Sequence, residues 1–237
     1  MQDDLNSLTR WSSKWLLKLN ASKCKVMHIG HSLDTTYNLS DDAGNIITIE
    51  QIAEEKDLGV QLTADLKSST QCLRSAAKAR SVMGMVKRNF RRLDKDDFLL
   101  IYKTYIRPRM EYCIQAWSPY LKKDIECLER VQRAATKMVQ GFHRLSYDDR
   151  LAQLSLTTLE QRRRRGDLIE TYKIVTGREA VDREHFFNLS TCEYNLRGHN
   201  LKLSKQRANL DIRKYFLANA RSTSGISYPR RSSMHSL

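Results

Sequence analysis

The sequence contains few residues that interrupt helices and few that form cross-links. Only nine Gly and three Pro occur in 237 residues, which disfavours a turn-rich all-β fold and favours long helices. The cysteines are scattered and include no CxxC pair, so neither a zinc ribbon nor a disulfide framework is indicated. The five cysteines are Cys24, Cys72, Cys113, Cys127 and Cys192.

Long apolar runs are also missing. No stretch approaches the roughly 18 consecutive apolar residues of a membrane-spanning helix. The first four residues, Met1 to Asp4, lack the basic start and apolar stretch of a signal peptide. We therefore expect an intracellular protein, nuclear or cytoplasmic, with reduced cysteines and no membrane partner. No GxxxxGK[ST], GxSxG or HExxH motif occurs, and we expect no small-molecule substrate.

Basic residues are abundant and unevenly distributed. Lys and Arg number 41 against 27 Asp and Glu, and the formal net charge is +14. Residues 1–65 carry a net charge of −4, residues 66–196 of +10, and residues 197–237 of +8. Such a chain favours a polyanion, with nucleic acid as the default partner. A ribosome-like or membrane-surface protein would share this charge, so charge alone does not decide the function.

The fold class predicted from periodicity and turn residues is α+β and helix-dominated. In residues 1–65, we expect a small antiparallel β element beside one amphipathic helix. The predicted elements are a helix with Leu5, Leu8, Trp11 and Trp15 on one face, a strand over 23–29, a hairpin whose arms at 37–39 and 46–49 flank 41–45, and a strand over 57–62.

Residues 66–177 predict a helical bundle, and 178–237 a basic extension with disorder over 222–237. The helix ends are predicted from capping residues and from Pro and Gly. The predicted elements are a helix with the stripe Leu66, Leu73, Ala76, Met83, Val86 and Phe90, a helix capped by Asp94 and stopped near Pro108, short helices over 109–117 and 147–153, the latter capped by Ser146, a helix over 125–138 closed by Gly141, and a helix opened by a Thr157–Glu160 capping box that ends near Gly177.

Two clusters of cations are candidates for phosphate contact. Lys87, Arg88, Arg91 and Arg92 lie at the predicted end of a long helix, where cations also complement the helix dipole. The run 162–165 is four consecutive arginines, which point about 100° apart on a helix and cannot all reach one phosphate row. Some of these arginines are expected to pair with acidic neighbours on the same helix, and Arg162 and Arg163 are our candidates for phosphate contact.

Aromatic and acidic residues have simpler interpretations. Tyr102, Tyr105, Tyr112, Trp117 and Tyr120 could stack on bases, but at helical spacing a core role is favoured. Asp3 and Asp4 are interpreted as first-turn acids of a helix and not as metal ligands. Cys192 and His199 lack further ligands at zinc-finger spacing, and we expect no metal site.

An ordered series of motifs over residues 2–220 resembles the reverse transcriptases of non-LTR (LINE-type) retrotransposons. Residues 4–30, DLNSLTRWSSKWLLKLNASKCKVMHIG, are similar to the segment that follows the catalytic aspartates. Residues 56–60, KDLGV, resemble the primer grip. Five later segments resemble parts of the family's downstream helical region: RPRMEY at 107–112, AWSPY at 116–120, LERVQRAATK at 128–137, LEQRR at 159–163 and RGH at 197–199.

The resemblance implies particular roles. The family's metal-binding aromatic-x-Asp-Asp turn lies upstream of the segment matched by Asp4, so the chain should hold no complete catalytic site and no Mg²⁺, which only the intact enzyme would use. Lys23 matches the motif D lysine, proposed as the proton donor to pyrophosphate. Leu58, Gly59 and Val60 match the position that holds the primer end. In the family, a Trp-Asn-x-Leu-Pro-like stretch follows, but this chain has SGISYP at 224–229.

The sequence therefore predicts a fragment of an RNA-directed DNA polymerase that holds an RNA/DNA duplex and does not polymerise by itself. The expected parts are a palm-edge remnant at 1–65, a thumb-like region at 66–177 and a C-terminal extension at 178–237. The alternatives are a non-catalytic nucleic-acid-binding module, and a helical interaction scaffold or unselected relic. The predicted nucleic-acid-binding residues are Lys87, Arg88, Arg91, Arg92, Arg162 and Arg163.

Overall fold

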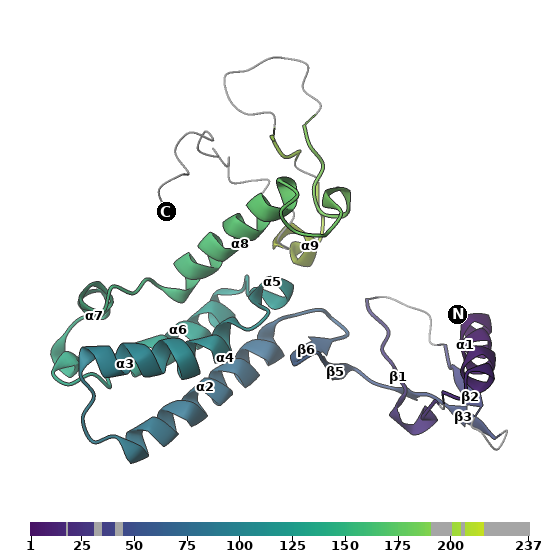
Figure 1. Cartoon of the computed structure of the whole chain (residues 1–237), viewed down its shortest axis with the longest axis horizontal. Helices are drawn as coiled ribbons and strands as arrows, with labels where there is room; N and C mark the ends of the chain where they lie inside the picture. Colours follow the sequence, from purple (N-terminus) through teal and green to yellow (C-terminus); the bar gives the residue numbers. More distant parts are fainter. Residues whose placement is uncertain (18, 31–34, 41–44, 191–200, 205–206, 216–237) are drawn as a thin grey trace. The chain divides into compact units, whose positions relative to one another are not determined.

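The computed structural model describes residues 1–17, 19–30, 35–40, 45–190, 201–204 and 207–215 (Figure 1). Its described residues are mostly helical with a few small sheets, which confirms the predicted α+β class. The chain divides into two compact units, Met1–Gln71 and Cys72–Leu237. The sequence placed the end of the first part at residue 65.

In its described residues, the first unit contains helix α1 and three strand pairs. Helix α1 has acids in its first turn, as expected, where they complement the helix dipole. Every sheet in the described residues has two strands: β1 with β4 is parallel, and β2 with β3 and β5 with β6 are antiparallel. The elements are α1 (Gln2–Lys14), a 3₁₀ turn (Ala21–Lys23), β1 (Lys25–Val26), β2 (Asn38–Ser40), β3 (Ile46–Thr48), β4 (Glu50–Gln51), β5 (Glu54–Asp57) and β6 (Val60–Thr63).

The core of the first unit is small. Ala21, Leu39 and Ile49 are buried together, with partly buried apolar neighbours around them. The predicted hairpin is confirmed in its arms, β2 and β3, while its predicted loop residues 41–44 lie outside the described residues. The predicted strand over 23–29 is wrong except for the two residues of β1, because Lys23 belongs to the preceding 3₁₀ turn.

The predicted strand over 57–62 is a hairpin turn followed by a strand. Asp57 pairs with Val60, so Leu58 and Gly59 form a two-residue loop between β5 and β6. Both loop residues have positive φ, 44° for Leu58 and 88° for Gly59. A tight hairpin turn with positive φ at both central residues follows the strand twist, which explains why Gly occupies the second position.

The second unit is built from helices. Helix α2 starts at the end of the first unit and continues into the second, and α3, α4 and α6 to α8 follow it in the chain (Figure 1). The elements are α2 (Ser69–Asn89), α3 (Lys95–Ile101), a π-helix (Tyr102–Ile106), α4 (Arg107–Glu111), α5 (Ile114–Trp117), α6 (Lys122–Thr136), a 3₁₀ turn (Phe142–Arg144), α7 (Tyr147–Gln153), α8 (Leu159–Val175), a 3₁₀ turn (Arg183–His185) and α9 (Asp211–Tyr215).

Helix α2 buries a face of small residues. Ala76, Met83 and Val86 are buried as predicted, whereas Leu66, Leu73 and Phe90 are exposed and that part of the predicted stripe is wrong. Small side chains such as Ala76 and Ala79 on a buried helix face allow neighbouring backbones to approach closely. The buried face includes Cys72, Ser75, Ala76, Ala79, Met83 and Val86.

The helical segment after Asp94 passes through Pro108 without stopping. Pro108 lacks an N–H to donate, and a π-helical segment (Tyr102–Ile106) precedes α4, which has Pro108 in its first turn. The predicted stop at Pro108 is therefore wrong. The predicted helix over 109–117 is also interrupted, because Cys113 adopts a left-handed φ of 51° between α4 and α5.

Capping residues set several helix ends. Asp94 and Ser146 accept hydrogen bonds from Asp97 N (2.8 Å) and Asp149 N (3.1 Å), confirming both predicted caps. The capping box at α8 is formed by Thr158 and Gln161 and not by Thr157 and Glu160. Gly177 closes α8 with a φ of 69°. Gly141 does not cap α6, which ends at Thr136, but precedes the 3₁₀ turn that begins at Phe142.

The end of α8 carries a small apolar cluster. Ile174 and Val175 pack with Phe187, and a bridge joins Leu189 to Leu203. The part of the predicted extension at 178–190 and 201–204 is therefore attached to the helix end by apolar contacts. The segment 222–237, predicted to be disordered, lies outside the described residues.

Candidate nucleic-acid interface

The end of α2 presents a concentrated positive charge. Lys87 and Arg88 occupy its last turn, and Arg91 and Arg92 follow directly. All four side chains are exposed. Within the described part of the chain, no carboxylate forms an ion pair with any of them. These four residues, called the α2 cluster below, are therefore available to phosphates.

The backbone around the α2 cluster is anchored on both sides. The buried face of α2 fixes the helix, and Leu93, directly after the cluster, is buried. The Leu93 carbonyl accepts a hydrogen bond from Gln140 N at 3.0 Å. The Asp94 cap then starts α3. Phosphate-binding residues on a fixed backbone lose less entropy on binding than those on a free loop.

The four arginines of α8 have four different environments. Arg162 makes a two-point contact with Glu111, with 2.7 Å from Nε to Oε1 and 3.2 Å from Nη2 to Oε2. Arg163 is buried. Arg164 pairs with Glu160 at 2.7 Å, as the helical spacing predicted. Arg165 is exposed and has no ion pair with a carboxylate among the described residues.

These environments change which arginines can contact a phosphate row. Glu111 also contacts Arg107 at 3.5 Å, and its hydrogen bond raises the pKa of Arg162. A two-point pair of this kind is strong and directional, so Arg162 primarily joins α8 to α4. Sequence reasoning missed Glu111, which lies 51 positions from Arg162, and no local pattern connects the two residues.

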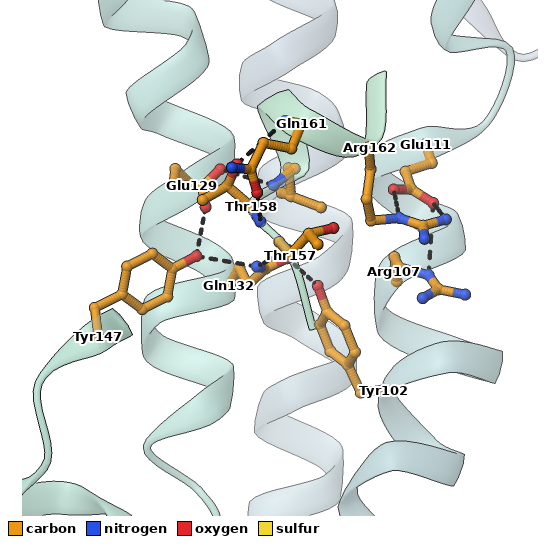
Figure 2. A network of polar contacts seen from close by, with 11 residues as sticks. Tyr102, Arg107, Glu111, Glu129, Gln132, Tyr147, Thr157, Thr158, Gln161 and Arg162 are labelled. Carbon is orange, nitrogen blue, oxygen red and sulfur yellow. Dashed lines mark hydrogen bonds and ion pairs between the residues drawn. The ribbon is translucent and has the colours of Figure 1, made fainter. Parts of the chain in front are cut away.

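A buried polar network fixes the start of α8 (Figure 2). Tyr102 donates to Gln132 Oε1 at 2.5 Å, and Gln132 Nε2 donates to the hydroxyl of Tyr147 (3.0 Å) and the carbonyl of Thr157 (2.9 Å). Glu129 accepts hydrogen bonds from the Tyr147 hydroxyl and from Leu159 N, the latter at 3.2 Å.

The network keeps its hydroxyls neutral. Burial raises the pKa of Tyr102 and of Tyr147 above the ordinary range, and the hydrogen bond from Tyr147 to Glu129 adds to the second shift. Both phenols therefore remain donors at neutral pH. A buried network in which each of these groups has a partner specifies one arrangement of the π-helix, α6, α7 and the start of α8. No pattern in the sequence indicated Glu129 or Gln132 for this role.

The aromatic candidates separate into buried and exposed residues. Tyr102 and Trp117 are core residues, as predicted. Tyr105 and Tyr112 are exposed, so the core prediction is wrong for these two, and their rings are accessible to bases. Tyr120 is partly buried and stacks on Tyr215, with ring centroids 5.1 Å apart.

The candidates of the first unit lie on short elements. Lys23 is exposed at the end of the 3₁₀ turn. Leu58 is 85% exposed at the tip of the β5–β6 hairpin, Gly59 is partly buried, and Val60 is buried in β6. The hairpin could therefore contact a nucleic-acid strand through Leu58 and the Gly59 backbone, but not through Val60.

Metal-ligating groups do not gather in the described residues. No group of three or more His, Cys, Asp or Glu side chains among them could hold a metal ion, and Cys24, Cys72, Cys113 and Cys127 are not joined in disulfides. Cys192 and His199 lie outside the described residues. In the part of the chain that the structure describes, no helix is both long and apolar enough to cross a membrane.

Comparison of the chain with models of protein families, with curated proteins and with solved structures gives no match. The function of the chain is therefore inferred from its residues and from their geometry.

Proposed function

We propose that this chain binds the sugar-phosphate backbone of a nucleic-acid duplex through the α2 cluster, as the thumb-like part of a non-LTR-type reverse transcriptase. The helical second unit would lie along the RNA/DNA duplex, and the β5–β6 hairpin would hold the primer end. The family assignment rests on the motif series in the sequence. The proposal includes duplex holding and does not include catalysis by this chain alone.

The observation that carries the proposal is the exposure of four neighbouring cations on a fixed backbone. Exposed Lys and Arg that are paired with carboxylates give up much of their attraction for phosphates, whereas the α2 cluster has no such partners in the described residues. Cations placed this way neutralise phosphates and release counterions without selecting a base sequence. The expected binding is therefore salt-sensitive and nearly independent of sequence.

Two further kinds of exposed group in the second unit could add contacts. Arg165 adds an exposed cation on α8, and Tyr105 and Tyr112 add exposed rings that could stack on unpaired bases at a duplex end. Arg162 and Arg163, which the sequence suggested for phosphate contact, have other environments. Their expected contribution to duplex binding is smaller than that of the α2 cluster.

The test is duplex binding by a charge-reversed chain. Replacement of Lys87, Arg88, Arg91 and Arg92 by Glu should lower the affinity for a labelled RNA/DNA duplex by about 100-fold at fixed salt, measured by fluorescence anisotropy. A matched control reverses four other exposed cations of the second unit and changes the net charge equally. The control residues are Lys122, Lys123, Lys137 and Arg144.

The control variant should lose less than about tenfold in affinity, because it changes only the long-range field of the protein. Equal losses in the two variants would mean that bulk charge explains the binding. That result would contradict a localised interface and would favour the alternative of an interaction scaffold or relic.

A further inference from the structure

An exposed aromatic ring lies within the α2 cluster. Phe90 follows Asn89, the last residue of α2, and separates the first two cations of the cluster from the last two. The Phe90 side chain is 50% exposed. Among the residues that the structure describes, no other ring and no cation is stacked on it. The α2 cluster therefore presents an accessible aromatic ring together with its positive charge.

The position of Phe90 is fixed by the helix before it. The Phe90 N–H donates a hydrogen bond to the Val86 carbonyl at 2.9 Å, so helical spacing continues to this residue. Phe90 therefore lies on the same face as Val86 and Met83, which are buried four and seven residues earlier. A ring that is half covered on a fixed backbone loses little conformational entropy when a ligand stacks on its exposed part.

The carboxylates that follow the α2 cluster are not paired with it. Asp94 accepts the cap hydrogen bond from Asp97 N at 2.8 Å. Asp96 and Asp97 lie in the first turn of α3, where the helix dipole attracts them. In the described residues, none of these three carboxylates forms an ion pair with a cation of the cluster. A ligand for this surface must therefore bring its own negative charge.

A nucleotide combines the two features that this surface would bind. Its phosphate is an anion, and its base has a flat π face that stacks on aromatic side chains whatever the base is. Bases inside a duplex are already stacked on one another, so a ring on the protein surface reaches a base only where the strand is unpaired.

We propose that Phe90 stacks on an unpaired base beside a duplex, while the α2 cluster binds phosphates of the same strand. This proposal rests on the duplex binding proposed above and specifies its preferred substrate, a duplex with a single-stranded overhang. The preference is for the presence of a base and not for its identity, because stacking is tolerant of sequence.

The test compares three labelled RNA/DNA duplexes by fluorescence anisotropy at fixed salt. One duplex is blunt, one has a short overhang, and one has the same overhang built from abasic nucleotides. The two overhangs carry equal charge, so the ratio of their affinities reports the contribution of the bases. We expect the wild type to bind the overhang with bases about tenfold more tightly than the abasic overhang.

Variants of Phe90 assign this ratio to its ring. Phe90→Leu keeps an apolar side chain but removes the π face, and should reduce the ratio to less than about twofold. Phe90→Trp should keep the ratio or raise it, because the larger ring also stacks on a base. The matched control is Met85→Ala, which removes a 51% exposed side chain without a ring from the same helix and should leave the ratio unchanged.

The proposal is overturned if the wild type binds the two overhangs equally, a result that needs no variant and so does not depend on how the variants fold. It is also overturned if Phe90→Leu keeps the full ratio, because the base would then contact another part of the chain. Displacement of the overhang duplex by an acidic, Leu-containing peptide at a lower concentration than an unlabelled copy of the duplex would likewise overturn it, in favour of a protein partner.

Failure of this proposal is distinguishable from failure of the proposed duplex interface. If charge reversal of the α2 cluster weakens binding of the blunt duplex while the two overhangs bind equally, the duplex interface stands and only the role of Phe90 is lost. If charge reversal leaves binding of the blunt duplex unchanged, the interface itself is contradicted.

Discussion

The two units of the chain differ in the size and packing of their buried cores. The second unit buries large side chains such as Phe98, Tyr102 and Leu128 almost completely, and its internal polar network is hydrogen-bonded. The first unit has a small buried cluster and only two-stranded sheets in its described residues, and it exposes Trp11 and Trp15. Isolated two-stranded sheets are marginally stable.

The difference shows that the larger buried core and the excess of positive charge lie in the same part of the chain. The negatively charged residues 1–65 belong to the unit with the smaller core, whereas the exposed cations of α2 extend from a helix with a buried face. A cationic surface repels itself and needs a well-packed support. The second unit supplies that support through α2, α6 and the network at the start of α8.

The largest expected contrast is in amide hydrogen exchange. Amides of β1 to β6 should exchange about 100-fold or more faster than those in the middle of α2 and α6, because segments with few buried apolar contacts open at lower free energy. Exchange measured by mass spectrometry on the full chain tests this. Equal protection of the amides in both units would contradict a difference in local stability between them.

The next largest effect concerns Glu129. Glu129→Ala leaves the Tyr147 hydroxyl and Leu159 N without their acceptor, and each buried donor costs about 1–3 kcal/mol. We expect the free energy of unfolding of the second unit to fall by about 3 kcal/mol, measured by denaturant titration. The control Glu126→Ala removes exposed pairs on the same helix and should cost less than about 1 kcal/mol.

A smaller effect locates the cap of α8. Thr158→Ala should destabilise the second unit by about 1 kcal/mol, because the Thr158 hydroxyl accepts from Gln161 N at 3.1 Å. Thr157→Ala is the matched control and should have little effect, since only the Thr157 backbone carbonyl accepts a hydrogen bond. The reverse order of the two losses would place the cap where the sequence alone suggested.

The smallest effect is a gain in the first unit. Leu58 is a non-Gly residue with positive φ at the hairpin tip, a conformation that costs roughly 1 kcal/mol or more. Leu58→Asn creates the favoured Asn-Gly turn and should slow exchange of the β5–β6 amides by up to about fivefold. Slower exchange together with weaker duplex binding would support a role for Leu58 in holding the primer end. Faster exchange would contradict a strained turn.

Local features of this fold were predictable and long-range ones were not. The caps at Asp94 and Ser146 depend on a hydroxyl or carboxylate three residues before its donor, so the sequence contains them directly. Arg162 and Glu111 pair across two helices although they are 51 positions apart in the chain. No periodic pattern in the sequence indicates such a contact.

The residues of α2 that were predicted to be buried but are exposed show that the sequence did not settle which side chains enter the core. The predicted stripe contained both Leu73 and Ala76, but only Ala76 is buried, and Cys72 and Ala79, which the stripe did not contain, are buried as well. Which face is buried depends on the neighbouring helices and on how closely they approach. For the candidate interface, the sequence suggested the residues of the α2 cluster, which stay a prediction, while the burial of Arg163 is seen only in the tertiary structure.

The central claim is tested most directly by the salt dependence of duplex binding. For each phosphate neutralised on a duplex, the slope of log K against log salt steepens by about 0.9. We predict that charge reversal of the α2 cluster reduces the magnitude of this slope by about 3 to 4, and that reversal of Lys122, Lys123, Lys137 and Arg144 reduces it by less than 1. The same slope in the wild type and the α2 variant would contradict the account.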